Sequence, residues 1–204
     1  MASGSSKRGV LTIPNVISLA RLALVPVFLW MLWGAHPARR GAAVLLAALG
    51  ASDWVDGYIA RHFDQTSELG KVLDPTADRV LLLAGAFALL HEHLGAAVDV
   101  VCWVVLVREV VIAGATIGLG LAGAKRIDVV WAGKAGTLAL MFALPMFLLA
   151  DAVPSARTPV DVLGWGFAIG GVVLGYYAAA KYVPAARAAL GEGRAARAAV
   201  EVEA

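Results

Sequence analysis

The sequence predicts an all-α, polytopic integral membrane protein with six transmembrane helices and a short interfacial helix at the N-terminus. Hydrophobic residues make up 60% of the 204 positions and charged residues only 16%, and the mean hydropathy is +0.78. Soluble domains contain about 45–50% apolar and about 25% charged residues, so these values are typical of a membrane protein. The length suits one compact helical domain.

The first 33 residues of the chain contain a tail and the first span. Residues 1–9 are small, polar and basic, and we expect a disordered cytoplasmic tail there. Pro14 and Asn15 predict a helix start, and Arg21 between apolar neighbours predicts an interfacial turn that leads into a span over Asn15–Trp33. A cleaved signal peptide is the alternative, but no clear cleavage site precedes His36.

Five more apolar stretches, separated by polar or proline-containing loops, predict the remaining spans. They cover residues 41–61, 72–90, 98–121, 129–149 and 160–182. We expect a membrane domain over residues 10–184 and a cytoplasmic tail over residues 185–204. Six spans put both termini and most basic loop residues on one side, which the positive-inside rule assigns to the cytoplasm of a plasma-membrane protein. The basic clusters lack interleaved aromatic residues, so no nucleic-acid partner is expected.

Four aspartates interrupt the apolar sequence where the second span ends and the third begins. Asp53 and Asp56 are three residues apart, and Asp74 and Asp78 are four apart, so each pair shares one helical face. Antiparallel spans would bring both pairs to the same depth. Four unpaired aspartates at a bilayer centre would cost about 10 kcal/mol, so we expect bound cations or a polar cavity.

The ligand chemistry of this cluster favours hard cations that bind a phosphate. Carboxylate oxygens suit Mg²⁺, Mn²⁺ or Ca²⁺, and the absence of a nearby Cys or His argues against zinc. Gly57, Ala60 and Gly70 would allow a nucleotide to approach closely, although small residues also serve simple helix packing. Arg61 is suited to pair with a phosphate.

Eight residues in this stretch have a fixed spacing, namely Asp53, Asp56, Gly57, Ala60, Arg61, Gly70, Asp74 and Asp78. The pattern resembles the signature of the CDP-alcohol phosphatidyltransferase family. The opening Pro14, Asn15, Ser18 and Arg21, the Arg108–Glu109 pair and the Gly133–Lys134 step resemble family members as well. The resemblance implies a six-helix membrane enzyme, usually a homodimer, that takes CDP-diacylglycerol and a hydroxyl acceptor and releases CMP.

The resemblance also implies roles for the signature residues. Asp53, Asp56 and Asp74 would coordinate two divalent cations, Mg²⁺ or Mn²⁺. Asp78 would neighbour these metals as a further ligand and serve as the general base that deprotonates the acceptor hydroxyl. The CDP moiety would lie against the remaining signature residues, Gly57, Ala60, Arg61 and Gly70.

The acceptor site is expected among cations near the cytoplasmic ends of the fourth and fifth spans, namely Arg108, Lys125, Arg126 and Lys134. Arg108 could instead pair with Glu109, and Lys125 and Arg126 could serve only as topology anchors. The chain lacks a second Arg-Glu pair in residues 113–121 and lacks Gln after Lys134-Ala-Gly-Thr137. These departures from phosphatidylglycerophosphate synthases resemble cardiolipin synthases, which favours phosphatidylglycerol as acceptor, with glycerol 3-phosphate as the alternative.

Two hypotheses from other classes remain at this point. A cation-coupled transporter would use the acids as an ion site, but such sites involve discontinuous helices and acids scattered along a pathway. A catalytically silent membrane scaffold would not need the complete signature.

Overall fold

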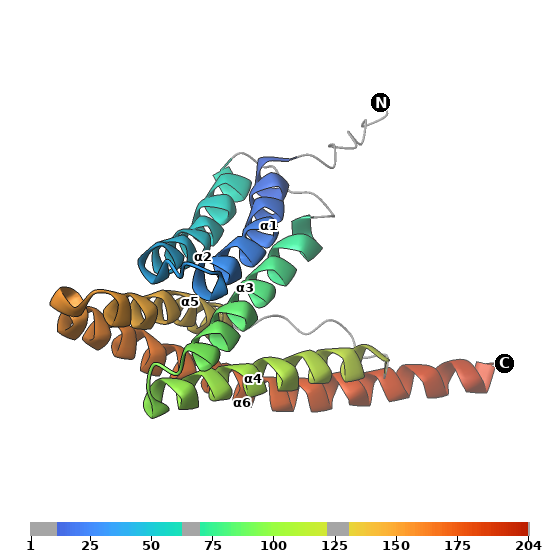
Figure 1. Cartoon of the computed structure of the whole chain (residues 1–204). Coiled ribbons are helices and arrows are strands. Elements are labelled where there is room, and N and C mark those ends of the chain that lie inside the picture. Colours follow the sequence, from blue (N-terminus) through green and yellow to red (C-terminus); the bar gives the residue numbers. More distant parts are fainter. Residues whose placement is uncertain (1–11, 63–69, 122–130, 204) are drawn as a thin grey trace.

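The computed structural model describes residues 12–62, 70–121 and 131–203, excluding the side chains at 13–14, 53–62, 71–72, 119–121 and 182–203. Its elements are α1 (Ile13–Trp33), α2 (Arg39–His62), α3 (Gly70–Glu92), α4 (Ala96–Leu121), α5 (Trp131–Ala152), the 3-10 turn η1 (Pro154–Ala156) and α6 (Arg157–Glu203). Figure 1 shows these helices, with no strand among the described residues. The predicted all-α class is confirmed.

Helix α1 begins near the predicted position. The Thr12 side chain accepts a hydrogen bond from the Asn15 backbone N–H at 3.4 Å, and a proline occupies the first turn, as is common at helix starts. The helix then runs without interruption to Trp33, so Arg21 lies within it instead of in a turn. The described residues contain no separate interfacial helix before α1.

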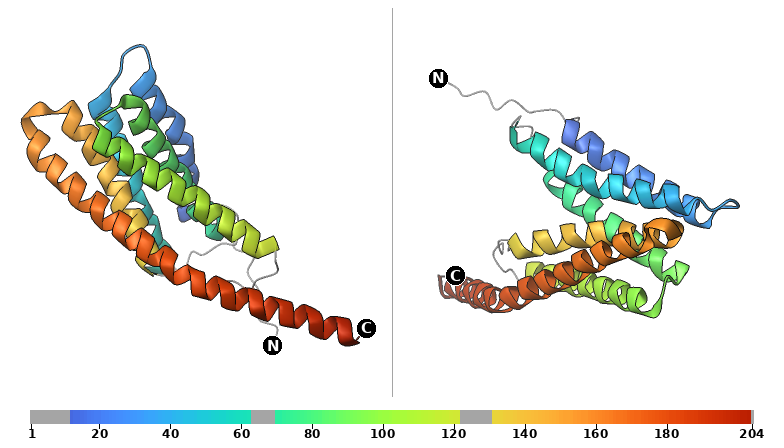
Figure 2. Two further views of the ribbon diagram at one scale, coloured as in Figure 1. Left: turned by 90° about the horizontal axis from the view of Figure 1, so that it is seen from below. Right: turned by 90° about the vertical axis from the view of Figure 1, so that its left-hand side faces the viewer.

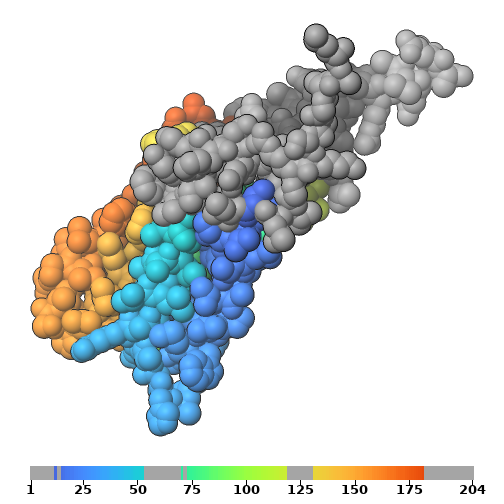
Figure 3. All heavy atoms as spheres, turned by 90° about the horizontal axis from the view of Figure 1, so that it is seen from above, coloured from blue at the N-terminus to red at the C-terminus, as the bar shows by residue number. Residues whose placement is uncertain are grey.

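The helices form two groups that cross each other. Helix α1 packs against α2 and α3, while α5 and α6 pack along each other, and contacts of α2 with α5 and α3 with α4 join the groups (Figures 1 and 2). Figure 3 shows α1 and α2 side by side on one face of the molecule, with α5 beyond α2. The core between them is built from large buried side chains such as Phe28, Leu81, Leu89 and Leu144.

Basic residues of α2 tie three helix ends together. Arg39 pairs with Glu92 at the end of α3 at 2.5 Å and with Asp151 at the end of α5 at 2.9 Å. The Arg40 Nε atom donates to the Ala152 carbonyl oxygen at 3.0 Å. Because the start of α2 and the ends of α3 and α5 meet here, the start of α3 points toward the opposite end of the molecule.

Four stretches are long and apolar enough to cross a membrane, counted over the described residues. They are Asn15–Trp33, Ala96–Gly118, Trp131–Ala152 and Pro154–Lys181. These apolar helices indicate a membrane protein. Helices α2 and α3, with 24 and 23 residues, are comparable in length but more polar. Helix α6 continues to Glu203, so the predicted boundary between membrane domain and C-terminal tail falls inside a helix.

Candidate active site

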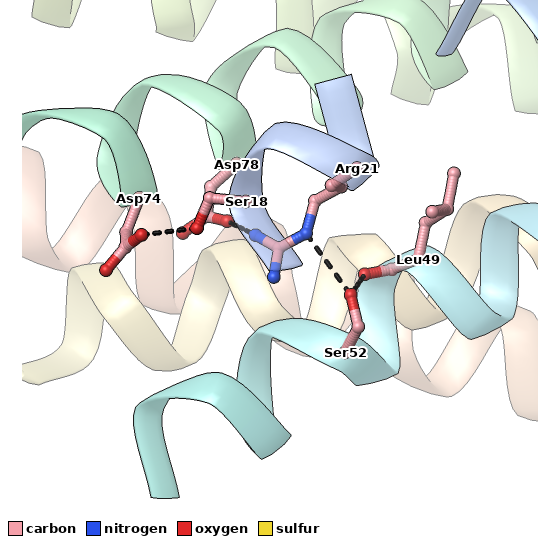
Figure 4. Close-up of polar contacts among 6 residues, drawn as sticks. All are labelled: Ser18, Arg21, Leu49, Ser52, Asp74 and Asp78. Carbon is pink, nitrogen blue, oxygen red and sulfur yellow. Dashed lines mark hydrogen bonds and ion pairs between the residues drawn. The ribbon is translucent and has the colours of Figure 1, made fainter. Parts of the chain in front are cut away.

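Two signature aspartates lie on the first turns of α3 and face polar residues of α1. Asp74 and Asp78 are the fifth and ninth residues of α3, one turn apart on the same side. The Ser18 hydroxyl donates to Asp74 Oδ1, and Arg21 Nη1 forms an ion pair with Asp78 Oδ1, as Figure 4 shows. Asp78 is therefore held about 12 Å along the axis from the start of α3, within the bundle.

A third helix joins this network through Ser52 of α2. Arg21 Nε donates to Ser52 Oγ at 3.3 Å, and the Ser52 hydroxyl donates to the Leu49 carbonyl oxygen at 2.7 Å (Figure 4). The Arg21 side chain has no exposed surface, whereas the Asp78 side chain is 23% exposed. The guanidinium thus holds a partly accessible carboxylate from its buried side.

The donor atoms at this place suit a hard divalent cation. Asp74 and Asp78 supply carboxylate oxygens that are half-buried, which is the ligand chemistry that Mg²⁺ and Mn²⁺ prefer. Asp53 and Asp56 belong to the last turns of α2, but their side chains lie outside the described ones. The described residues alone form no group of three or more metal-ligating side chains. The four-carboxylate cluster therefore stays a prediction.

Most residues predicted to bind the nucleotide have side chains that the structure does not describe. Gly57, Ala60 and Arg61 belong to the backbone of the last turns of α2, where side chains are not described. Gly70 is described: it is buried and is the first residue of α3, four residues before Asp74. Its place in the fold agrees with a position beside the aspartates.

Of the predicted acceptor residues, Arg108 has the most informative surroundings. Arg108 and Glu109 of α4 are both buried and pair at 2.5 Å, as the sequence alternative anticipated. A Cβ atom on Gly175 of α6 would lie 2.9 Å from Arg108 Nε, so the guanidinium rests against a glycine. That Nε atom is buried and has no hydrogen-bond partner among the described atoms. The guanidinium is therefore enclosed between Glu109 and α6 with one donor left unsatisfied among the described atoms.

The other predicted acceptor residues are placed differently. Lys134 lies on the first turn of α5 with an exposed side chain. Lys125 and Arg126 lie outside the described residues. No described contact joins Arg108 or Lys134 to the aspartates of α3, so a shared site for all of them stays a prediction.

The sequence interpretation assigned no role to Ser18, Arg21 and Ser52, which the structure places in the site. A signal for the first two was present, because Asn15, Ser18 and Arg21 recur every three residues in an apolar span and so share one face. Asn15, Ser18 and Arg21 are each at most 1% exposed, and Ser52 is half-buried. A polar stripe of this kind inside a membrane helix commonly faces a functional site.

A wide cavity of about 790 Å³ lies at the far end of the molecule, where Arg39, Arg40, Trp33 and His91 line it. This cavity does not include the aspartates. The candidate site is therefore the polar network of Ser18, Arg21, Ser52, Asp74 and Asp78 near the start of α3, and not the cavity.

The chain is similar in sequence to known proteins. The family model described as CDP-alcohol phosphatidyltransferase matches residues 11–177. The cardiolipin synthase (CMP-forming) of Streptomyces coelicolor is 38% identical over 181 residues, which cover 85% of this chain and 82% of that protein. The CDP-diacylglycerol–glycerol-3-phosphate 3-phosphatidyltransferases of Bacillus subtilis and Pseudomonas fluorescens are 33% and 31% identical, over 76% and 80% of this chain and 83% and 85% of their own lengths.

Proposed function

We propose a reaction for this chain from one premise: the chain belongs to the CDP-alcohol phosphatidyltransferase family. The protein transfers the phosphatidyl group of CDP-diacylglycerol to a hydroxyl of a glycerol-based acceptor and releases CMP. The acceptor oxygen forms a bond to the phosphorus that carries diacylglycerol, and the bond from this phosphorus to the oxygen of CMP breaks. The acceptor proton passes to a carboxylate of the protein.

One observation carries this proposal beyond family membership. Asp74 and Asp78, the last two acids of the signature, lie on one face of α3 and are held by fully buried Ser18 and Arg21. Helix packing alone does not require a buried guanidinium and two carboxylates, since such groups are costly away from water unless they are paired. Their joint placement supports a catalytic role for this end of α3.

The signature acids are proposed to bind two divalent cations, Mg²⁺ or Mn²⁺. Asp74 and Asp78 would be joined by Asp53 and Asp56, whose helix reaches the same end of the molecule. When bound, such cations neutralise charge that develops on the pyrophosphate. Gly57, Ala60, Arg61 and Gly70 are proposed to line the CDP site.

Asp78 is the proposed general base. It is partly exposed, and Arg21 contacts one of its carboxylate oxygens, Oδ1, from the buried side. A carboxylate near the acceptor hydroxyl accepts the proton as the new bond forms, and its fixed position compensates for its weak basicity. The proton therefore ends on Asp78 and leaves the site to water after the transfer.

Phosphatidylglycerol is the proposed acceptor, so the product is cardiolipin. Identity to the Streptomyces coelicolor cardiolipin synthase is 38%, against 33% and 31% to the two glycerol-3-phosphate transferases. Arg108 offers an unpartnered, buried Nε donor that suits a phosphate oxygen of the acceptor. Lys134, Lys125 and Arg126 are proposed to add positive charge on the acceptor side.

Glycerol 3-phosphate is the second candidate acceptor. It is favoured by the similarity to the Bacillus subtilis and Pseudomonas fluorescens transferases along more than three quarters of this chain. Arg108 does not discriminate between the two acceptors, because both carry a phosphate group.

Several features of the membrane setting are proposals as well. We propose six spans, with α2 and α3 crossing the bilayer beside the four apolar helices, since their lengths are comparable. Both termini and the aspartates then face the cytoplasm. We also propose that the membrane is the plasma membrane and that the protein acts as a homodimer. Arg39 forms ion pairs that join the start of α2 to the ends of α3 and α5. This supports a topology in which successive helices cross the membrane in opposite directions.

A product analysis tests the proposed reaction. Purified protein in detergent micelles is incubated with CDP-diacylglycerol, Mg²⁺ or Mn²⁺, and either phosphatidylglycerol or glycerol 3-phosphate, and the lipid products are identified by mass spectrometry. We expect cardiolipin with phosphatidylglycerol. Phosphatidylglycerophosphate as the sole product would assign the second acceptor, and no lipid product with either acceptor would contradict the proposed reaction.

A further inference from the structure

Arg21 is the most deeply buried charged side chain of the described network, and it belongs to α1, outside the eight signature residues. Its guanidinium uses two different nitrogen atoms for two different helices: Nη1 pairs with Asp78 of α3, and Nε donates to Ser52 of α2. Figure 4 shows the guanidinium lying between these two helices. The planar group is thereby fixed in orientation as well as position.

A purely structural role does not explain this choice of residue well. Burying a guanidinium costs several kcal/mol unless it is paired, and apolar side chains of similar volume often stabilise a bundle equally or better. The partner that it engages is Asp78, which is 23% exposed and lies one turn from Asp74. The charge of Arg21 is thus directed at a carboxylate that remains accessible to a substrate.

We propose that Arg21 is a positioning residue for the Asp78 carboxylate, and that Ser52 in turn positions Arg21. This inference rests on the proposed function, in which Asp78 takes the acceptor proton. An aspartate side chain rotates about two bonds, and a misplacement of about 1 Å can cost about 100-fold in rate. The ion pair with Arg21 restricts this rotation, and it reaches the carboxylate from the side away from the substrate. Ser52, which donates to the Leu49 carbonyl oxygen, holds the guanidinium plane in place.

Substitutions at Arg21 separate this role from simple helix packing. Arg21→Met keeps most of the apolar volume and removes the contacts with Asp78 and Ser52, and Arg21→Lys keeps the charge but offers one nitrogen in place of three. We expect kcat for CMP release to fall about tenfold to 100-fold in Arg21→Met and less in Arg21→Lys, with a KM for CDP-diacylglycerol within about twofold of wild type. Arg157→Met, at the exposed start of α6, is the matched control and should leave kcat unchanged.

A readout other than activity accompanies these assays. Stabilisation of the protein by CDP with Mg²⁺ or Mn²⁺, followed as the shift of the thermal unfolding midpoint in detergent, should be largely retained in Arg21→Met, because three of the four proposed cation ligands, Asp53, Asp56 and Asp74, remain. Loss of this shift would show that Arg21 acts on nucleotide binding or folding, which would overturn the positioning role.

A double-mutant cycle tests the link through Ser52. Ser52→Ala should lower kcat severalfold in the wild-type background and have no effect in the Arg21→Met background, because Ser52 acts only through Arg21. Equal losses in both backgrounds, or an Arg21→Met protein with kcat within twofold of wild type, would overturn the inference. If Arg21→Met does not fold, Arg21→Lys takes its place in the cycle.

Wild-type protein that releases no CMP with either acceptor would refute the proposed function and this inference together. An active wild type with an unaffected Arg21→Met would refute the inference alone.

Discussion

At the scale of single residues, the buried side chains of Arg21 and Arg108 differ in how their Nε donors are satisfied. Arg21 forms an ion pair with Asp78 and donates a hydrogen bond from Nε to Ser52, so its side chain links α1, α3 and α2. Arg108 pairs with its neighbour Glu109 through Nη1, but its Nε is buried with no partner among the described atoms. A buried donor without a partner costs about 1–3 kcal/mol, which a ligand can recover by accepting from it. Arg21 is accordingly the proposed positioning residue, and Arg108 is the proposed acceptor-binding residue.

The proposed base gives the first prediction. Asp78→Asn should lower kcat for CMP release by about 100-fold or more, because the amide does not accept the acceptor proton. The measurement is steady-state CMP release under saturating CDP-diacylglycerol and acceptor. Asp161→Asn, in α6 at the far end of the molecule, is the matched control and should keep wild-type activity. Activity of Asp78→Asn within threefold of wild type would refute this assignment.

The acceptor contact gives the second prediction. Arg108→Lys removes the Nε donor and keeps the positive charge, so the KM for the acceptor should rise about tenfold while the KM for CDP-diacylglycerol stays the same. Initial rates at varied concentrations of each substrate separate the two constants. An unchanged acceptor KM, or an equal rise of both constants, would place Arg108 outside the acceptor site.

At the scale of helices, α5 and α6 approach each other closely at Gly136. A Cβ atom on Gly136 would lie 2.9 Å from both the Gly171 carbonyl oxygen and the Gly175 backbone nitrogen. Backbone atoms cannot rotate away as a side chain does, so the two helices must separate if Gly136 is enlarged. Gly175 also contacts Arg108 of α4, which makes this crossing part of the support for the candidate acceptor site.

Substitution of this glycine gives the third prediction. Gly136→Ala should destabilise the protein by about 1–3 kcal/mol, as overpacking of a close contact does. The thermal unfolding midpoint in detergent should fall by several degrees. Gly170→Ala, whose added Cβ would have no atom within 4 Å, should leave the midpoint unchanged or raise it slightly. Equal midpoints for the two variants would contradict the tight crossing.

The helices and their order could be predicted from sequence, because apolar stretches of spanning length are separated by polar loops. The end of α6 could not, since hydropathy marks the end of an apolar stretch near Tyr182 and not the end of a helix. The residues beyond it are rich in Ala and Arg, which favour continued helix to Glu203. Periodicity likewise does not specify which helices become neighbours. The acids of the third span could be placed on one face, but the contact of Arg21 and Ser18 with them depends on α1 packing beside α3.

At the scale of the whole molecule, the two ends differ in chemistry. One end gathers Arg39, Glu92 and Asp151 in ion pairs that join α2, α3 and α5. The other end contains the start of α3, with the two described aspartates and the polar face of α1. The proposed topology assigns the first end to the outside and the second to the cytoplasm, where soluble cations and CMP are exchanged.

Accessible cysteines test this orientation. The single native cysteine, Cys102, is fully buried, so the wild-type protein gives a low labelling background. A membrane-impermeant maleimide should label Ser155→Cys, in the exposed turn η1, in intact cells. Trp131→Cys, at the exposed start of α5, should be labelled only in inverted vesicles. The reverse pattern would invert the proposed topology.

The measurement that tests the central claim most directly is CMP release by purified protein with CDP-diacylglycerol, with and without divalent cations. With phosphatidylglycerol and Mg²⁺ or Mn²⁺, we predict steady CMP release. Chelation by EDTA should abolish it, and renewed Mg²⁺ or Mn²⁺ should restore it. CMP release that continues at full rate in EDTA would contradict the proposed role of the carboxylates, and no release with either acceptor in the presence of both cations would contradict the proposed transferase reaction.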